Sequence, residues 1–361
     1  MTRPMRWAGA AAAGTAALAL LVAGCVFAAM AGPALSLHTR TQALRQTLAG
    51  LASADKTVQM TSGLADFTNP NGYSEPLQQQ QLTRQQLEDS AAELGGGLAA
   101  AGVPLAAGAW AGLTTRLLPV ASGAGPGAQA GTGPELEVVY RDRLPGYAGL
   151  AAGSYSGTAV PAGAVAVAVT GPTAARFGLR PRSVLTLATA SGTVKLVVTG
   201  IVRQRDPGSA FWTLDPTVAA PSLNTPPQRP SYWAGGVFAD PGQLGAMQDA
   251  FGAPSPTLDW VFPLAVGGVT ADQAQALADD LNRVTTAAPA LAGQFQAASG
   301  TVMVTSPLIS DLAVFLAAQS AVETVLLLLF VSLALVGVAV VMLAARMIVA
   351  ARDGELTTLR A

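Results

Sequence analysis

The sequence predicts a membrane protein of the α+β class, in which two transmembrane helices flank an outer domain of mixed strands and helices. Two uncharged apolar runs, residues 7–32 and 324–345, are each long enough to cross a bilayer, which needs roughly 20 residues. Between them the sequence alternates strand-like and helix-like segments. Only 11% of the residues are charged, against roughly 25% in a typical soluble domain, which also favours a membrane protein.

The first apolar run, residues 7–32, is predicted to be a retained transmembrane helix. It is longer than the roughly 7–15 apolar residues of a cleaved signal peptide. Residues 1–6 contain two arginines, which predicts a cytoplasmic N-terminus. The alternative is a lipoprotein signal, because "LVAGC" ends at Cys25, and acylation there would give a lipid-anchored outer binding protein. The chain stays apolar after Cys25, which favours the transmembrane helix.

Residues 33–51 are predicted to form an amphipathic stalk helix just outside the membrane. The Gly32-Pro33 pair ends the preceding segment. Four leucines then recur near one face at helical spacing, and these are Leu37, Leu44, Leu48 and Leu51. A second stalk helix, described below, is expected to pair with this one.

The outer domain is predicted to cover residues 52–307. A helix is expected at residues 75–105, broken or ended by the glycine triplet at 95–97. Residues 111–120 and 135–144 have the composition of strands.

The middle of the outer domain, residues 162–212, gives the clearest pattern. It predicts a strand, a short helix and a hairpin that turns at Ser191-Gly192. A strand is expected at residues 232–240, after an irregular Pro-rich connection at 215–230. Helices are expected at residues 241–251 and 270–287, the second with Thr270 as its N-cap.

The last part of the chain predicts one long helix followed by a turn. Residues 308–323 form the second stalk helix, residues 324–345 the second transmembrane helix, and residues 346–361 a cytoplasmic turn. Between residues 308 and 351 there is no proline, and Gly337 is the single glycine. Some 40 helical residues would extend about 60 Å, twice the hydrocarbon thickness, so the surplus is expected to protrude outward.

The charges that follow the second span predict the topology. Arg346, Arg352 and Arg360 place the C-terminus in the cytoplasm, as the arginines near the start do for the N-terminus. We therefore expect a multi-pass protein of the plasma membrane with residues 33–323 outside the cytoplasm.

No residues for catalysis, cofactor binding or metal binding are predicted. Lys56 and Lys195 are the only lysines and neither follows a glycine, so the sequence contains no P-loop. One cysteine, Cys25, and one histidine, His38, exclude an internal disulfide and an ordinary His/Cys metal site. The "GSYSG" stretch places Tyr155 where a nucleophile elbow needs serine. A net charge of −1 argues against a nucleic-acid partner.

Three stretches carry a resemblance to a known family. They are "AGPALSLHTRTQALRQTLA" at residues 31–49, "AARFGLRPRSVLTLATASGTVKLVVTGIV" at 174–202 and "ARDGELTTLRA" at 351–361. With the topology, they resemble the FtsX-like, or MacB-like, permease family of ABC transporters. Arg182 departs from the pattern, since the family often has glycine in that turn. Family members also have at least two further membrane helices, which we expect a longer product or a separate chain to supply.

The resemblance implies that the chain is a permease segment. An enzyme is not expected, because no catalytic constellation appears in the sequence. A separate cytoplasmic P-loop ATPase would hydrolyse ATP, and the outer domain would move to export cargo, handle lipids or lipoproteins, or transmit force. The resemblance gives Arg352, Glu355, Leu359 and Arg360 a role in coupling to that ATPase. Alternatively, the two arginines only set the topology.

Other partners implied are membrane lipid and the remaining permease helices or a second permease copy. The rival hypothesis is a two-span sensor with a ligand-binding outer domain. It would need a cytoplasmic signalling domain, which the sequence does not contain.

Overall fold

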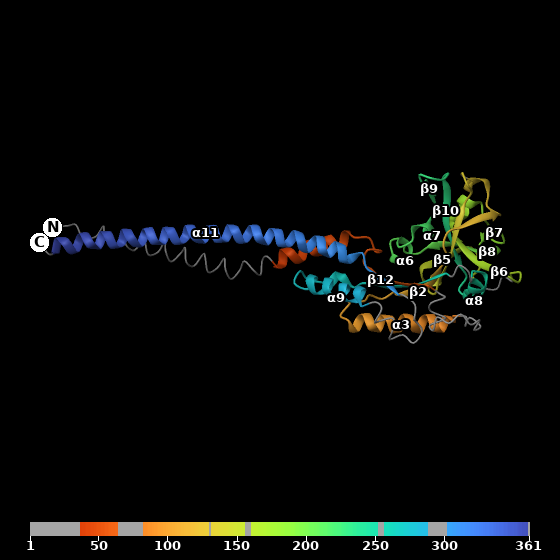
Figure 1. Ribbon diagram of the computed structural model, residues 1–361, viewed down its shortest axis with the longest axis horizontal. Helices are drawn as coiled ribbons and strands as arrows, with labels where there is room; N and C mark the ends of the chain where they lie inside the picture. Colours follow the sequence, from red (N-terminus) through yellow and green to blue (C-terminus); the bar gives the residue numbers. More distant parts are fainter. Residues whose placement is uncertain are drawn as a thin grey trace. The chain divides into compact units, whose positions relative to one another are not determined.

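The computed structural model describes residues 37–63, 82–129, 131–155, 160–251, 256–287 and 302–359 (Figure 1). The chain divides into two compact units, which are described separately. The first unit consists of Met1–Thr47, Val269–Gln275 and Asp311–Ala361, and the second of Leu48–Gly268 and Ala276–Ser310. The predicted first transmembrane helix, residues 7–32, lies outside the described residues.

The second unit is built on one mixed β-sheet. Its strands are β1 (Thr57–Gly63), β2 (Trp110–Thr114), β3 (Leu118–Ser122), β4 (Glu135–Arg141), β5 (Ala148–Gly153), β6 (Ala164–Thr170), β7 (Val184–Thr189), β8 (Gly192–Gln204), β9 (Ser222–Asn224), β10 (Tyr232–Ala239), β11 (Thr257–Pro263) and β12 (Met303–Thr305). Their order is β12-β1-β11-β2-β4-β3-β7-β8-β6-β10-β9, and β5 pairs with β8. A further pairing of β4 with β10 closes the run from β4 to β10 into a ring.

Helices accompany this sheet. They are α3 (Arg84–Ala100), α4 (Leu144–Tyr147), α5 (Gly171–Phe177), α6 (Ala210–Thr213), α7 (Pro216–Ala219), α8 (Leu244–Ala250) and α9 (Ala274–Thr286), with 3₁₀ turns at Pro126–Ala128 and Val266–Gly268. The mixture of helices and strands confirms the α+β class. The connection at 215–230, predicted to be irregular, contains α7 and β9.

The segment at residues 162–212 follows the prediction closely. It forms β6, α5 and the β7–β8 hairpin in that order. Every residue of β6 is buried, as expected for a strand that pairs in parallel with β8. Thr189 pairs with Gly192, so the two-residue turn is Ala190-Ser191, one position before the predicted turn.

The helix predicted at residues 75–105 is only partly described, because residues 75–81 lie outside the described residues; the described helix, α3, is shorter at its C-terminal end, and the prediction was wrong at the glycine triplet. The helix begins after Thr83, whose hydroxyl accepts from the Gln86 N–H while the Gln86 side chain accepts from the Thr83 N–H. It then continues through residues 95–97. A Cβ on Gly95 would lie 3.3 Å from the Phe262 ring, so glycine here allows α3 to pack closely on β11. Tertiary packing therefore outweighs the low helix propensity of glycine.

The core of the second unit is rich in aromatic side chains. Trp110, Phe211, Trp212 and Phe238 are each almost completely buried. The rings of Phe211 and Trp212 meet edge to face at 5.1 Å, and those of Trp212 and Phe238 at 5.5 Å.

Residues 37–50, which run from the first unit into the start of the second at Leu48, are helical, as predicted. Leu44 is fully buried and Leu48 is 4% exposed, whereas Leu37 is 42% exposed. The predicted apolar face therefore holds over the later turns of the helix but not at its start.

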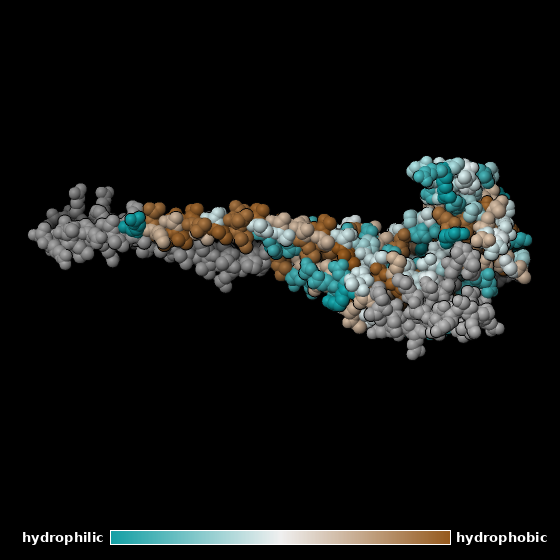
Figure 2. All heavy atoms as spheres, in the orientation of Figure 1, coloured by the Kyte–Doolittle hydropathy of each residue, from teal (hydrophilic) through white to brown (hydrophobic). Residues whose placement is uncertain are grey.

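The helix α11 (Leu308–Leu359) begins in the second unit and continues through the first as one helix of 52 residues. A turn was expected after residue 345, but the backbone stays helical to Leu359. The segment contains no proline, and Gly354 inside a helix costs only about 1 kcal/mol. Residues Leu308–Leu343 are long and apolar enough to cross a membrane, with none of their most apolar window buried. Figure 2 shows the hydrophobic surface along this helix.

Candidate functional site

The two predicted stalk helices are joined by an ion pair within the first unit. Arg40, on the helix at residues 37–50, donates from its guanidinium to the Glu323 carboxylate on α11. Both side chains are partly exposed, and such pairs contribute about 0–1 kcal/mol. The pair therefore fixes the register of the two helices more than it adds to stability. The prediction that the stalk helices pair is supported at this position.

A second contact within the first unit involves the part of this helix that belongs to that unit, residues 37–47. The Thr41 hydroxyl accepts a hydrogen bond of 3.2 Å from the Ala271 N–H. Leu44 and Leu312, from the two stalk helices, are both at most 1% exposed. These two leucines are thus packed inside the structure, whereas His38, on the helix at residues 37–50, is exposed.

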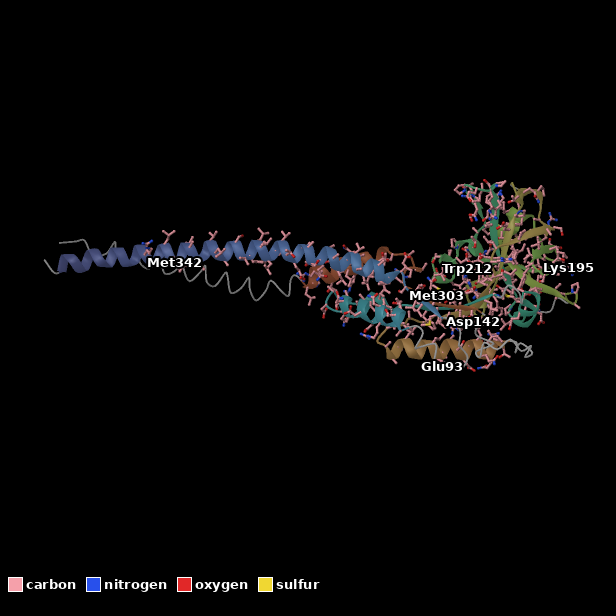
Figure 3. All side chains as sticks on the ribbon, viewed as in Figure 1. Glu93, Asp142, Lys195, Trp212, Met303 and Met342 are labelled. Carbon is pink, nitrogen blue, oxygen red and sulfur yellow. The ribbon has the colours of Figure 1, made fainter. Side chains whose placement is uncertain are left out.

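The character of α11 changes sharply at Glu323. No charged residue follows until Arg346, 23 positions later (346 − 323), which corresponds to about 35 Å of helix. This distance matches the roughly 30 Å hydrocarbon thickness of a bilayer. Within this stretch, Leu335 and Met342 are both 66% exposed, and Figure 3 shows Met342 on the helix surface. Such exposure of large apolar side chains is unfavourable in water and favourable in lipid.

The role of the four predicted residues in coupling to an ATPase stays a prediction. Arg352, Glu355 and Leu359 lie on the helical backbone of α11 at spacing i, i+3 and i+7, which places their Cα atoms on one side of the helix. Arg360 and Cys25 lie outside the described residues.

A buried arginine, which the sequence did not single out, lies at the centre of the second unit. Arg141 on β4 is 2% exposed. Its guanidinium carbon lies 4.4 Å from the centre of the Trp110 ring, 4.9 Å from that of Phe211 and 5.7 Å from that of Phe238. It donates to the Phe211 carbonyl and lies 3.8 Å from the Asp215 carboxylate. Burial lowers the pKa of Arg141.

Three carboxylates surround this cation, and together with Arg141 we call them the Arg141 cluster: Glu137, Asp215 and Asp259. Burial and the neighbouring Asp215 raise the pKa of Glu137 to about 7. Burial also raises the pKa of Asp259 to about 6, although Asp259 accepts a 2.6 Å hydrogen bond from Thr114. The cluster therefore ties together β4, β11 and the start of α7 around the aromatic core.

A separate buried carboxylate, Asp240, follows β10. Both of its oxygens accept from the Thr199 hydroxyl, at 3.0 and 2.8 Å. Burial raises the pKa of Asp240 to about 6. Within the described ranges, no group of three His, Cys, Asp or Glu side chains could hold a metal ion.

Comparisons with known proteins found similarity to solved structures. No protein-family model matches the chain, and no curated protein matches its sequence. The chain is similar to the solved periplasmic region of MacB from Actinobacillus actinomycetemcomitans, with 11% identity over 70% of this chain and 89% of that one, at a TM-score of 0.30. It is also similar to a permease domain from Porphyromonas gingivalis, with 11% identity over 70% and 91%, at a TM-score of 0.25.

Proposed function

We propose that this chain is the membrane-anchored part of an FtsX- or MacB-like ABC permease, in which α11 transmits movement between the cytoplasm and the outer domain. The observation that carries the proposal is the continuity of α11. It begins at Leu308 in the second unit, passes through an uncharged stretch of membrane length and continues beyond Arg346 without a break. The resemblance of residues 31–49, 174–202 and 351–361 to that family supports the same function.

The length of α11 suits a mechanical role. Its 52 residues extend about 78 Å, whereas the hydrocarbon layer takes up about 30 Å. The apolar part has no charged residue at its middle, and a polar translocation path would normally require some. We therefore infer that the helix moves as a lever and does not line a pore.

The proposed binding partners of this chain follow from its resemblance to the permease family. The family resemblance implies a cytoplasmic ATPase as the partner, and the residues nearest to it would be Arg352, Glu355, Leu359 and Arg360. The remaining permease helices or a second permease copy, together with membrane lipid, would surround α11. Residues 33–323 would lie outside the cytoplasm of a plasma membrane protein whose two termini are inside.

The topology can be tested with single cysteines in a Cys25→Ser background, because Cys25 is the only cysteine. We expect Ser191→Cys to react with an impermeant maleimide in intact cells, and Thr357→Cys to react only after permeabilisation. Labelling of both positions in intact cells would refute the proposed function.

The coupling role is tested by charge reversal. We expect Glu355→Arg and Arg360→Glu to abolish co-purification of a P-loop ATPase with the full-length product. The matched control is Glu93→Arg on the exposed face of α3, labelled in Figure 3, which should leave co-purification unchanged. Retained binding by both reversed variants would contradict the coupling role.

A further inference from the structure

The short helix α7 meets the sheet at a point where two carboxyl groups share one hydroxyl. Glu137 on β4 and Asp215, the residue before α7, both contact the side-chain hydroxyl of Thr217 on α7. The distance from the Thr217 hydroxyl oxygen to the Asp215 carboxylate is 2.6 Å. The two carboxyl groups also lie within hydrogen-bonding reach of each other. We call the side chains of Glu137, Asp215 and Thr217 the α7 contact.

The α7 contact needs one proton more than the hydroxyl supplies. A hydroxyl carries a single proton, and an ionised carboxylate can only accept. The Thr217 hydroxyl therefore cannot donate to Glu137 and Asp215 together while both are charged. If one carboxyl group is protonated, it donates to the hydroxyl, and the hydroxyl donates to the other carboxylate. The contact is complete only in that state.

The surroundings of the two carboxyl groups decide which one holds the proton. Asp215 accepts a hydrogen bond of 3.2 Å from the Thr217 backbone N–H and lies 3.8 Å from the Arg141 guanidinium. Both neighbours favour the charged form of Asp215. Burial and the charge of Asp215 instead raise the pKa of Glu137 to about 7. The proton therefore belongs to Glu137.

The strands beside Glu137 offer little charge to offset its ionisation. On β4 itself, Glu135 is paired with Arg229 at 3.2 Å. On β10, the residue that pairs with Glu137 is Gly236, which has no side chain. Arg116, in the connection between β2 and β3, is exposed and forms no ion pair in the described structure.

The remaining charges near Glu137 are those of the Arg141 cluster. Arg141 is its one cation, and it also faces Asp215 and Asp259. With all three carboxyl groups ionised, the net charge of the cluster is −2 (1 − 3), and a proton on Glu137 reduces it to −1. Ionisation of Glu137 thus adds repulsion at a largely buried place, where charges are screened less than at the surface.

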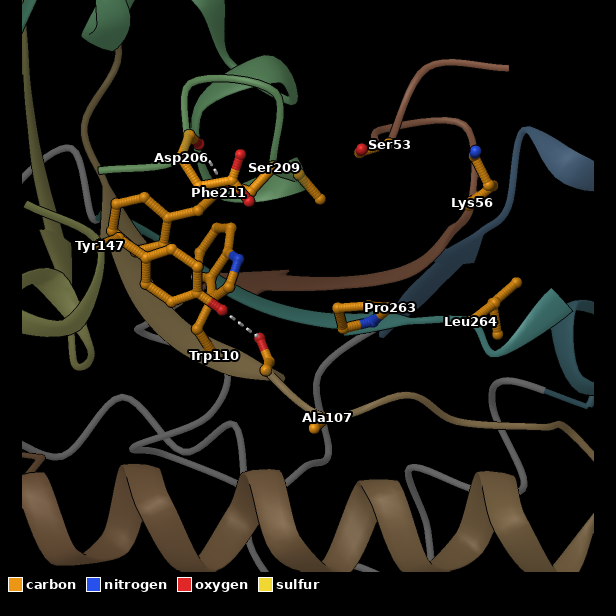
Figure 4. A pocket seen from close by; sticks show the side chains of 12 residues that line it. Ser53, Lys56, Ala107, Trp110, Tyr147, Asp206, Ser209, Phe211, Pro263 and Leu264 are labelled. Carbon is orange, nitrogen blue, oxygen red and sulfur yellow. Dashed lines mark hydrogen bonds between the residues drawn. The ribbon is translucent and has the colours of Figure 1, made fainter. Parts of the chain in front are cut away.

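The two short helices of this segment are held in different ways. On α7, Val218 is fully buried, and a Cβ on Gly236 would clash with it, so α7 packs directly on β10. On α6, Phe211 stacks on Tyr147 at 4.3 Å and meets Trp110 edge to face at 5.7 Å (Figure 4). Loss of the α7 contact would therefore loosen α7 and leave α6 in place.

We propose that the α7 contact is a proton-operated latch, which holds α7 on β4 and β10 while Glu137 is protonated and loosens α7 when Glu137 ionises. Loosening would expose Val218 and the surface of β10 beneath it. The other side-chain hydrogen bond to α7 runs from Gln204 to the Ala219 carbonyl at 3.1 Å and contains no titratable group. The latch lies within the second unit alone, so its test is independent of the topology and ATPase coupling proposed above.

The test is amide hydrogen–deuterium exchange of residues 214–220 in the full-length protein in lipid nanodiscs. Rates would be measured at pH 6 and pH 8 and corrected for the intrinsic effect of pH on exchange. The pKa of Glu137 is about 7 in the closed latch and returns to its ordinary value of 4.5 when the latch opens. Protection of these amides should therefore be about tenfold greater at pH 6 than at pH 8. Equal protection at the two pH values would overturn the proposal.

Variants assign this pH response to one carboxyl group. Glu137→Gln cannot ionise, and its amide can still donate to the Thr217 hydroxyl, so protection should be the same at both pH values. Glu135→Gln, on the same strand, and Asp240→Asn, at the separate buried carboxylate, should keep the full response. A full response in Glu137→Gln, or its loss in Asp240→Asn, would contradict the latch.

If Glu137→Gln does not fold, Asp215→Asn decides. This variant removes the neighbouring anion that raises the pKa of Glu137. The midpoint of the pH response should then move to lower pH by at least about one unit. An unchanged midpoint would show that the two carboxyl groups do not share a proton and would overturn the proposal.

Discussion

Replacing Arg182 with glycine should stabilise the second unit. Residues 180–183 form a turn in which the Ser183 N–H donates to the Arg180 carbonyl at 2.9 Å. Pro181 occupies the second position and Arg182 the third, with φ at 75°. This is a type II turn, which requires positive φ at its third position and therefore favours glycine. Among the described residues, Arg182 is the only non-glycine residue with positive φ.

The magnitude follows from two opposing effects. The left-handed conformation costs a residue with a Cβ about 1–2 kcal/mol, and glycine avoids this cost. Glycine also loses about 0.5–1 kcal/mol more backbone entropy on folding. Because the Arg182 side chain is exposed and forms no ion pair in the described structure, its loss adds little. The net stabilisation expected of Arg182→Gly is about 0.5–1 kcal/mol.

The assay is urea unfolding of the full chain in detergent, followed by tryptophan fluorescence. Buried Trp212 and Trp260 report on the core of this unit. The control is Arg180→Gly in the same turn, where φ is negative, and this variant should lose about 0.5–1 kcal/mol. If Arg182→Gly loses stability to the same extent as Arg180→Gly, the left-handed turn is refuted.

Three other predictions concern a buried carboxylate, a glycine pair and the cysteine. Because burial raises the pKa of Asp240 to about 6, its native state binds a proton more tightly than the unfolded chain. As the pH falls from 8 to 5, protonation of Asp240 should therefore raise the free energy of unfolding by about 1–1.5 kcal/mol. In Asp240→Asn this contribution should be absent when unfolding curves at the two pH values are compared. Gly96→Ala should stabilise α3 by about 0.5–1 kcal/mol in thermal unfolding, since a Cβ there meets nothing within 4 Å. Gly95→Leu should destabilise the second unit by about 1–3 kcal/mol, because the larger side chain would clash with Phe262. Cys25→Ser should leave the protein in the membrane fraction with an unchanged mature N-terminus by mass spectrometry; release into the soluble fraction would favour the lipoprotein alternative.

The sequence predicted the local elements where periodicity and turn residues agreed. The run from β6 to β8 was found because one continuous apolar strand and two strands of alternating pattern are separated by Gly, Pro and Ser. The strands β1 and β11 were missed. They pair with each other over their whole length although about 200 residues separate them, and neither has a strong alternating pattern or a hairpin turn of its own. Their pairing depends on contacts that no local window contains.

For α11, the sequence alone determined the apolar length and the flanking charges, because helical rise and the preference of side chains for lipid are properties of a contiguous segment. Only the tertiary structure decided the Arg141 cluster. Its side chains come from separate parts of the chain, and the sheet order β11-β2-β4 brings them to one place. Burial then shifts the pKa values of Arg141, Glu137 and Asp259, and burial is a property of the folded unit, not of any one residue.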